Sequence, residues 1–127
     1  QTADIIFPGE QQPESDHGIR YEQAETGTNK DRHFRRAKGW FGYTLKTSKE
    51  ASRLMITTRK NDPMKVVILL NNEKLTAAPT ISETDQEGFV ILCYPLPQKL
   101  GAGNYPIRFS PDGTEWTPAI YEIRLLE

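Results

Sequence analysis

The fold is decided by residues 39–45, which read Gly39-Trp40-Phe41-Gly42-Tyr43-Thr44-Leu45. Alternate residues form one largely aromatic face, made by Phe41, Tyr43 and Leu45. This period of two is typical of a strand that is half-buried in a sheet. On the other face, Gly42 marks either a bulge or a close approach of another backbone, and Trp40 lies either flat against its own sheet or in a shallow recess.

Further short runs of apolar and β-branched residues predict more strands, at residues 4–8, 53–59, 65–70, 73–78, 88–94, 105–109 and 119–126. Asn71-Asn72 predicts a two-residue hairpin turn, because asparagine tolerates a positive φ. Pro106 predicts an edge strand or the beginning of a strand. Residues 10–38 and 79–87 are polar and rich in breakers, so we expect the first to be ordered loop with one or two short strands and the second to be loop.

Eight or nine strands with turns every 8 to 12 residues and no helical period predict an all-β fold, an antiparallel β-sandwich of the jelly-roll or galactose-binding-like kind. Residues 1–127 are expected to form a single domain. The predicted core consists of Phe41, Tyr43, Leu45, Leu54, Ile56, Ile107, Phe109, Tyr121 and Ile123.

Charge and composition exclude several classes of partner. The net charge is -1 with 26% charged residues of both signs, which predicts no nucleic-acid partner. The basic residues within 30–38 are interpreted as a solvated loop. No run of eighteen apolar residues is present, so no membrane partner is expected. The chain begins at Gln1 rather than methionine, which predicts a processed chain or a fragment of a longer protein.

Titratable residues give little sign of catalysis. Glu10, Glu14 and Asp16 are close in sequence, but no partner group identifies a general acid and base. Glu10 and Asp16 could instead supply ligands to a structural calcium ion, although the regular calcium-loop pattern is missing. The two histidines are interpreted as hydrogen-bonded loop residues, and the single Cys93 as a buried, inert thiol.

Aromatic side chains are the natural candidates for contact with a sugar, because their faces offer apolar area to its C–H groups. The candidate carbohydrate-binding residues are Trp116, Trp40, Tyr21 and Phe34. Trp116 follows the polar turn Asp112-Gly113-Thr114-Glu115, so it is the candidate expected to be most exposed.

Three segments carry a family resemblance: residues 9–17 (GEQQPESDH), 32–43 (RHFRRAKGWFGY) and 68–75 (ILLNNEKL). In order and spacing, over nearly the whole chain, they resemble the C-terminal β-sandwich accessory domain of the β-L-arabinofuranosidase-like glycoside hydrolases, family 127 and its relatives. The chain departs from that pattern at Phe34, where the family has tryptophan, at Gly42, where it has serine, and at Asn72, where it has glycine.

The resemblance implies a non-catalytic accessory module of a plant-glycan-degrading glycoside hydrolase, most familiar from gut Bacteroidetes and secreted or periplasmic. Catalysis in such enzymes lies in a separate helical barrel, so no catalytic residue is carried over to this chain. The implied partner is the catalytic domain of the same parent chain, and a plant polysaccharide is a second implied partner.

Two functions therefore stay open. A module that docks on a catalytic domain should expose an apolar patch, expected around Met55, Val67, Leu69 and Leu126. An autonomous carbohydrate-binding module for arabinose-containing plant glycans should instead present Trp116 or Trp40 in a groove, with amides such as Asn61 or Asn104 nearby.

Overall fold

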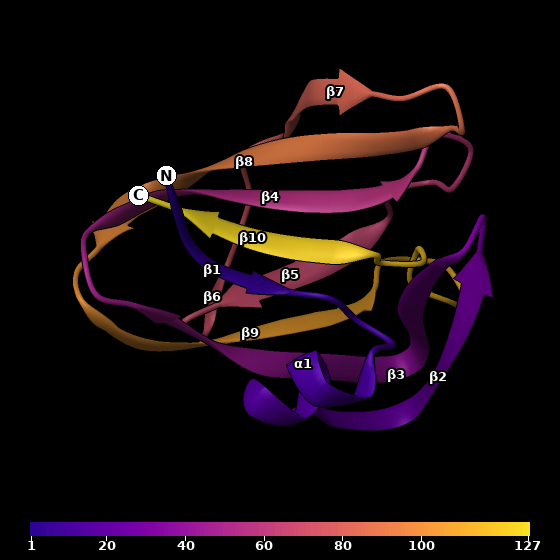
Figure 1. Ribbon diagram of the computed structural model, residues 1–127, viewed down its shortest axis with the longest axis horizontal. Helices are drawn as coiled ribbons and strands as arrows, with labels where there is room; N and C mark the ends of the chain where they lie inside the picture. Colours follow the sequence, from indigo (N-terminus) through magenta and orange to yellow (C-terminus); the bar gives the residue numbers. More distant parts are fainter.

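Two five-stranded antiparallel sheets form the computed structural model, which describes residues 1–127 (Figure 1). In spatial order, sheet A contains β1 (Thr2–Ile6), β10 (Glu122–Leu126), β4 (Ala51–Arg59), β8 (Phe89–Leu100) and β7 (Thr80–Thr84). Sheet B contains β2 (Arg20–Asn29), β3 (Arg32–Thr47), β9 (Gly103–Pro111), β5 (Val66–Leu70) and β6 (Glu73–Lys74). This architecture confirms the predicted β-sandwich jelly roll.

The single helix, α1 (Gln11–Asp16), has six residues and lies between β1 and β2 in the chain. The structure contains no helix with the length and apolar character needed to cross a membrane.

All nine residues expected in the core are buried, each less than 9% exposed, and eight of them pack in the main cluster between the sheets. Phe41 of β3 stacks on Phe109 of β9 with ring centroids 5.0 Å apart, and Tyr43 meets Phe41 edge-on at 6.0 Å. Tyr121 belongs to a smaller cluster with Phe89 and Ala119 rather than to the main one. The alternation in residues 39–45 therefore predicted the buried face of this strand, with Phe41, Tyr43 and Leu45, correctly.

Gly42 lies where the backbones of β3 and β9 come close, which is one of the two alternatives expected for this glycine. A Cβ atom added there would stand 2.5 Å from the carbonyl oxygen of Ile107 in β9. A bulge lies elsewhere in β3, where Lys38 and Gly39 together oppose the single residue Gln23 of β2 between the pairs Glu22↔Trp40 and Ala24↔Ala37.

Residues 10–38 were wrongly expected to be mostly loop. After α1 they form a long hairpin in which β2 pairs with β3 from Arg20↔Gly42 to Asn29↔Arg32. Its two-residue turn is Lys30-Asp31, with φ of 52° and 63°. The basic segment interpreted as a solvated loop is thus part of β3, and the hairpin escaped prediction because β2 is an exposed edge strand with a polar sequence.

Three further expectations are corrected. Residues 79–87 contain β7, whose five residues are all exposed at the edge of sheet A. The strand expected to end before Pro95 continues as β8 to Leu100. The strand expected at 73–78 is only Glu73–Lys74. The hairpin turn at Asn71-Asn72 is confirmed, with φ of 53° and 65°.

Pro106 lies in β9, which is an inner strand of sheet B and not an edge. Its backbone points toward the β5–β6 turn, because its carbonyl accepts a hydrogen bond from Asn71 N–H at 2.8 Å. Strand β5 has ended at Leu70, so no neighbouring strand requires the N–H that proline lacks.

The connections β2–β3, β4–β5, β7–β8 and β9–β10 meet at one end of the sandwich, which we call the loop end (Figure 1, right). The two termini lie side by side at the opposite end, where Glu127 N–H donates to the Gln1 carbonyl at 2.8 Å.

Candidate functional site

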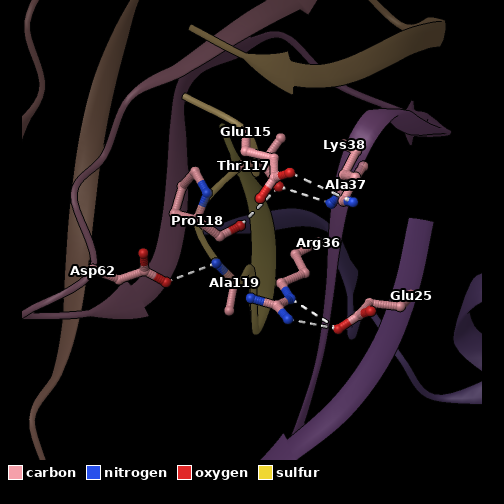
Figure 2. A network of polar contacts seen from close by, with 9 residues as sticks. All are labelled: Glu25, Arg36, Ala37, Lys38, Asp62, Glu115, Thr117, Pro118 and Ala119. Carbon is pink, nitrogen blue, oxygen red and sulfur yellow. Dashed lines mark hydrogen bonds and ion pairs between the residues drawn. The ribbon is translucent and has the colours of Figure 1, made fainter. Parts of the chain in front are cut away.

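Residues 117–120, which we call the strap, connect the two sheets at the loop end. Toward sheet B, Thr117 N–H donates to the Ala37 carbonyl at 2.8 Å, and Ala37 N–H donates to Thr117 Oγ1 at 3.0 Å (Figure 2). Toward sheet A, Thr58 Oγ1 donates to the Ala119 carbonyl at 2.8 Å. The strap therefore has bonding partners on both sides and is a fixed part of the loop end.

A hollow of about 340 Å³, the loop-end cleft, opens beside the strap. It is lined by Asn29, Phe34, Arg36, Arg59, Asn61, Asp62, Ala119 and Tyr121. These residues come from the ends of β2, β3 and β4, from the β4–β5 connection and from the strap and its continuation toward β10. Its volume is at the lower end of the range for small-molecule sites, which suits one sugar ring.

The apolar wall of the cleft consists of two aromatic rings. Phe34 and Tyr121 lie 5.4 Å apart between centroids, tilted by 59°, and Tyr121 in turn meets Phe89 edge-on at 4.9 Å. Phe34 also covers its cross-strand partner Gly27, where an added Cβ would stand 2.6 Å from the ring. Packing on both sides fixes the Phe34 ring as a preformed surface at the cleft.

The polar rim contains both donors and acceptors. Arg36 is held by Glu25, with Nε and Nη2 at 2.9 and 2.7 Å from the same carboxylate oxygen (Figure 2). Asp62 Oδ2 accepts the Ala119 N–H at 2.9 Å. The side chains of Asn29 and Asn61 are exposed at the opening, where their amides can both donate and accept.

Tyr121 adds a hydroxyl group to this rim. Burial raises the pKa of the Tyr121 phenol, although a hydrogen bond with Asn29 and the charge of Arg59 act in the opposite direction. The hydroxyl therefore stays protonated at neutral pH and can donate as well as accept. A fixed aromatic surface beside amides, guanidinium groups and a hydroxyl is suited to binding a polyhydroxylated ligand.

The four aromatic residues predicted to contact sugar are not brought together. Phe34 lines the loop-end cleft. Trp116 lies beside the cleft, but Arg36 and Lys38 lie over its ring at 4.3 and 5.2 Å. Tyr21 is 52% exposed on β2 with the Arg35 guanidinium over its ring at 4.5 Å, and Trp40 lies on the outer face of sheet B.

Asn29, Arg36, Arg59 and Tyr121 are cleft residues that the sequence interpretation missed. Asn29 and Arg36 belong to the β2–β3 hairpin, a region that was expected to be mostly loop. Arg59 ends β4, a strand that was predicted without its direction in the sheet. The signal that could have found them is the polar pair Lys30-Asp31, which permits a two-residue turn and places Asn29 and Arg32 opposite each other.

Glu14 is committed to structure rather than catalysis. Its carboxylate receives Nε and Nη2 of Arg35 at 2.7 and 2.9 Å and the Tyr43 hydroxyl at 2.6 Å. Burial acts to raise the pKa of Glu14, but the hydrogen bonds from Arg35 and Tyr43 outweigh it and hold that pKa below its ordinary value. Glu14 thus stays ionised inside the protein and is unsuited to donating a proton.

The expected calcium ligands lie at the two ends of α1. Glu10 is the residue before the helix, and Asp16 is its last residue and accepts a hydrogen bond from Gln12 at 2.8 Å. No group of three or more His, Cys, Asp or Glu side chains in the chain is arranged to hold a metal ion. His17 hydrogen-bonds Asp4 Oδ1 at 2.8 Å and the Pro13 carbonyl at 2.7 Å, in line with its interpretation as a loop histidine.

The expected apolar docking patch does not form one surface. Met55 lies on sheet A, Val67 and Leu69 lie on sheet B, and Leu126 is only 8% exposed. The only large hydrophobic residues that are mostly exposed are Tyr21, at 52%, and Ile81, at 69%, and they lie on different sheets. Cys93, expected to be buried, is half-buried on β8.

A second hollow, of about 360 Å³, lies on the outer face of sheet A and contains Glu122, Arg124 and Arg32. Both of its arginines pair with Glu122, which lies 3.2 Å from Arg124 and 4.0 Å from Arg32, and Glu83 and Asp85 make the lining net acidic. The loop-end cleft, which adds exposed amides to a fixed aromatic wall, is therefore the better candidate for a binding site.

Several solved structures with a similar fold are carbohydrate-binding modules. The family 35 module from Paenibacillus barcinonensis matches with a TM-score of 0.68 and 11% identity over 98% of both chains. The family 35 module from Clostridium thermocellum matches with a TM-score of 0.64 and 13% identity over 97% of this chain and 98% of that one. The family 6 module from Clostridium cellulolyticum, solved in complex with xylose, matches with a TM-score of 0.63 and 10% identity over 98% of both chains. At these identities the likeness establishes the fold.

No curated protein matches the chain by sequence. Residues 1–126 match the family described as "Family of unknown function (DUF6805)". The match covers the chain almost from end to end, and the chain therefore belongs to the DUF6805 family.

Proposed function

We propose that this chain is a non-catalytic glycan-binding module that holds a sugar residue in the loop-end cleft. The observation that carries the proposal is the Phe34–Tyr121 wall, 5.4 Å between centroids, facing the exposed amides of Asn29 and Asn61. The ring faces offer apolar area to the C–H side of a sugar, and the amides offer paired donors and acceptors to its hydroxyls. The likeness in fold to carbohydrate-binding modules supports this assignment.

Calorimetric titration with arabinan, arabinogalactan and xylan fragments tests the proposal. We expect saturable binding with a Kd below about 1 mM, a free energy near -4 kcal/mol. Asn61→Ala removes an exposed rim amide and should weaken binding by about tenfold, the effect of one lost hydrogen bond to a ligand. Asn104→Ala is the matched control, because Asn104 is an exposed asparagine in β9 that does not line the cleft.

The absence of catalysis is part of the proposal. The one buried carboxylate, Glu14, is held ionised by Arg35 and Tyr43, which leaves it no proton to give. The purified chain should release no sugar from arabinofuranosides or other plant glycans. Hydrolysis that disappears in Glu10→Gln or Glu14→Gln would overturn this part.

The module belongs, in this proposal, to a secreted or periplasmic glycoside hydrolase, as the resemblance to the family 127 accessory domain implies. One observation favours a supporting role there as well. The catalytic unit of the GH87 α-1,3-glucanase from Streptomyces thermodiastaticus contains a similar fold: all of this chain matches 27% of that chain, with a TM-score of 0.58 and 11% identity. Deleting the module from the parent enzyme separates the roles, because loss of thermal stability with unchanged retention on insoluble glycan would indicate docking alone.

A further inference from the structure

A third hollow, of about 300 Å³, lies on the outer face of sheet B, away from the loop-end cleft. We call it the sheet B recess. Side chains of β2, β3, β9 and the β5–β6 turn surround it, among them Arg20, Trp40, Thr44, Asn72 and Arg108.

Gly42 forms the floor of the recess, and its missing side chain creates the depth. It pairs with Arg20 on one side and with Arg108 on the other. Residues paired across antiparallel strands project on the same face, so the two arginine side chains rise on either side of the glycine. Their Cβ atoms are two strand spacings apart, about 10 Å, which leaves room for a ligand between the guanidinium groups.

Arg108 is oriented in advance. Its guanidinium lies 3.9 Å from the centroid of the Trp40 ring, so the face of the group is covered while its N–H edges stay available. A stacked arginine loses less side-chain freedom when it takes up a ligand, and its forked N–H groups match the two oxygens of a carboxylate.

The arginines of the recess are also unpaired. Of the eight arginines in the chain, Arg32, Arg35, Arg36 and Arg124 pair with carboxylates, and Arg59 donates to the Glu87 carbonyl. That leaves Arg20, Arg53 and Arg108, and two of these three line the recess. Glu22, opposite Trp40 in register, brings one negative charge to this face, and Lys74, opposite Leu69, brings a further positive one, so the face is net positive.

We propose that the sheet B recess is a second binding site, for a carboxylate-bearing sugar residue, that is, a uronic acid of a glycan chain. Arg20 and Arg108 hold the carboxylate from two sides, and Asn72 and Thr44 bond ring hydroxyls. Leu69 and Pro106 supply the apolar contact. The anion preference stands on the unpaired arginines, whereas the choice of a sugar as its carrier rests on the proposed function.

Calorimetry of the full chain with glucuronate, galacturonate, xylose and acetate tests this site. We expect the two uronates to bind saturably and far more tightly than acetate. Arg108→Gln and Arg20→Gln should each weaken uronate binding by about tenfold or more, since a hydrogen-bonded charge is lost. Both residues are exposed, so the variants should fold normally. Arg53→Gln, which removes an exposed unpaired arginine from sheet A, is the control and should leave uronate binding unchanged.

Three results would overturn the inference. Uronate binding that survives Arg108→Gln but is lost in Asn61→Ala would place the charged sugar in the loop-end cleft. Acetate binding as tight as uronate would reduce the recess to a general anion site, and tighter binding of an oligoglutamate peptide would assign it to a protein partner. Uronate binding in the recess without any neutral-sugar binding in the cleft would instead overturn the proposed function alone.

Discussion

Arg35 of β3 and Glu14 of α1 form a bidentate ion pair inside the sandwich, with N–O distances of 2.7 and 2.9 Å. Both residues are buried, Arg35 at 8% and Glu14 at 5% exposure. The pair ties the short helix to sheet B, and the Tyr43 hydroxyl completes it at 2.6 Å. A six-residue helix has little stability of its own, so its position depends on this contact.

Removing one partner of this pair should be costly. Arg35→Met leaves the Glu14 carboxylate buried without its counter-charge, and we expect it to lower the free energy of unfolding by about 3 to 5 kcal/mol. The double variant Arg35→Met with Glu14→Gln should recover part of that loss. Urea denaturation measures both, and a loss below about 1 kcal/mol for the single variant would contradict the structural role.

Acid should weaken the protein through the same carboxylate. Although burial alone would raise the pKa of Glu14, the hydrogen bonds from Arg35 and Tyr43 leave it lower in the folded protein than in the unfolded chain. The unfolded chain therefore takes up the proton first, and the stabilisation is fully present above about pH 4.3 and is lost as pH falls through the lower folded pKa. Unfolding free energies measured from pH 6 to pH 2 should fall less steeply in Glu14→Gln, and equal slopes would contradict this.

Gly42 should resist replacement. In Gly42→Ala the new methyl group meets the Ile107 carbonyl at 2.5 Å, so β3 and β9 must shift, and we expect a loss of about 1 to 3 kcal/mol. Gly101 is the control, because nothing lies within 4 Å of an added Cβ and Gly101→Ala should be neutral or slightly stabilising. Thermal unfolding of the two variants compares them directly. Equal melting temperatures would contradict the close approach of β3 and β9 at Gly42.

The inward phase of β4 gives a fourth prediction. Ile56 is fully buried between the sheets, and Ile56→Ala should cost about 2 to 5 kcal/mol. Its neighbour Met55 points to the outer face of sheet A, so Met55→Ala should cost clearly less. Denaturant titration measures both losses. A larger loss for Met55→Ala than for Ile56→Ala would show that the other face of β4 points inward.

The sequence predicted the inner parts of the sandwich better than its edges, and the reason is physical. In β3, β4 and β9 one face is buried, so apolar residues recur with period two and the phase can be read. Edge strands β2 and β7 bury almost nothing, so their sequences carry no such period and look like loop. The turn at Asn71-Asn72 was recognised because asparagine favours positive φ, whereas Lys30-Asp31 adopts the same geometry with less distinctive residues.

The site was predicted only in part for a related reason. Phe34 and Asn61 could be named from their residue types, but Asn29 meets Phe34 only through the β2–β3 hairpin, and Tyr121 comes from a distant part of the chain. Their meeting depends on the β2–β3 hairpin and on the strap, neither of which has a sequence period. Trp40 was placed correctly beside Gly42, while the arginines that give its recess a charge become visible only through cross-strand register.

The central claim is that a glycan binds in the loop-end cleft, and the most direct test is to map the bound ligand on the protein by NMR. Amide spectra recorded during titration with arabinan and xylan oligosaccharides should show saturable shifts at Asn29, Asn61 and the strap residues 117–120, with small changes at Asn104. Absence of saturable shifts at millimolar ligand, or shifts confined to the outer face of sheet A around Met55, would contradict the account.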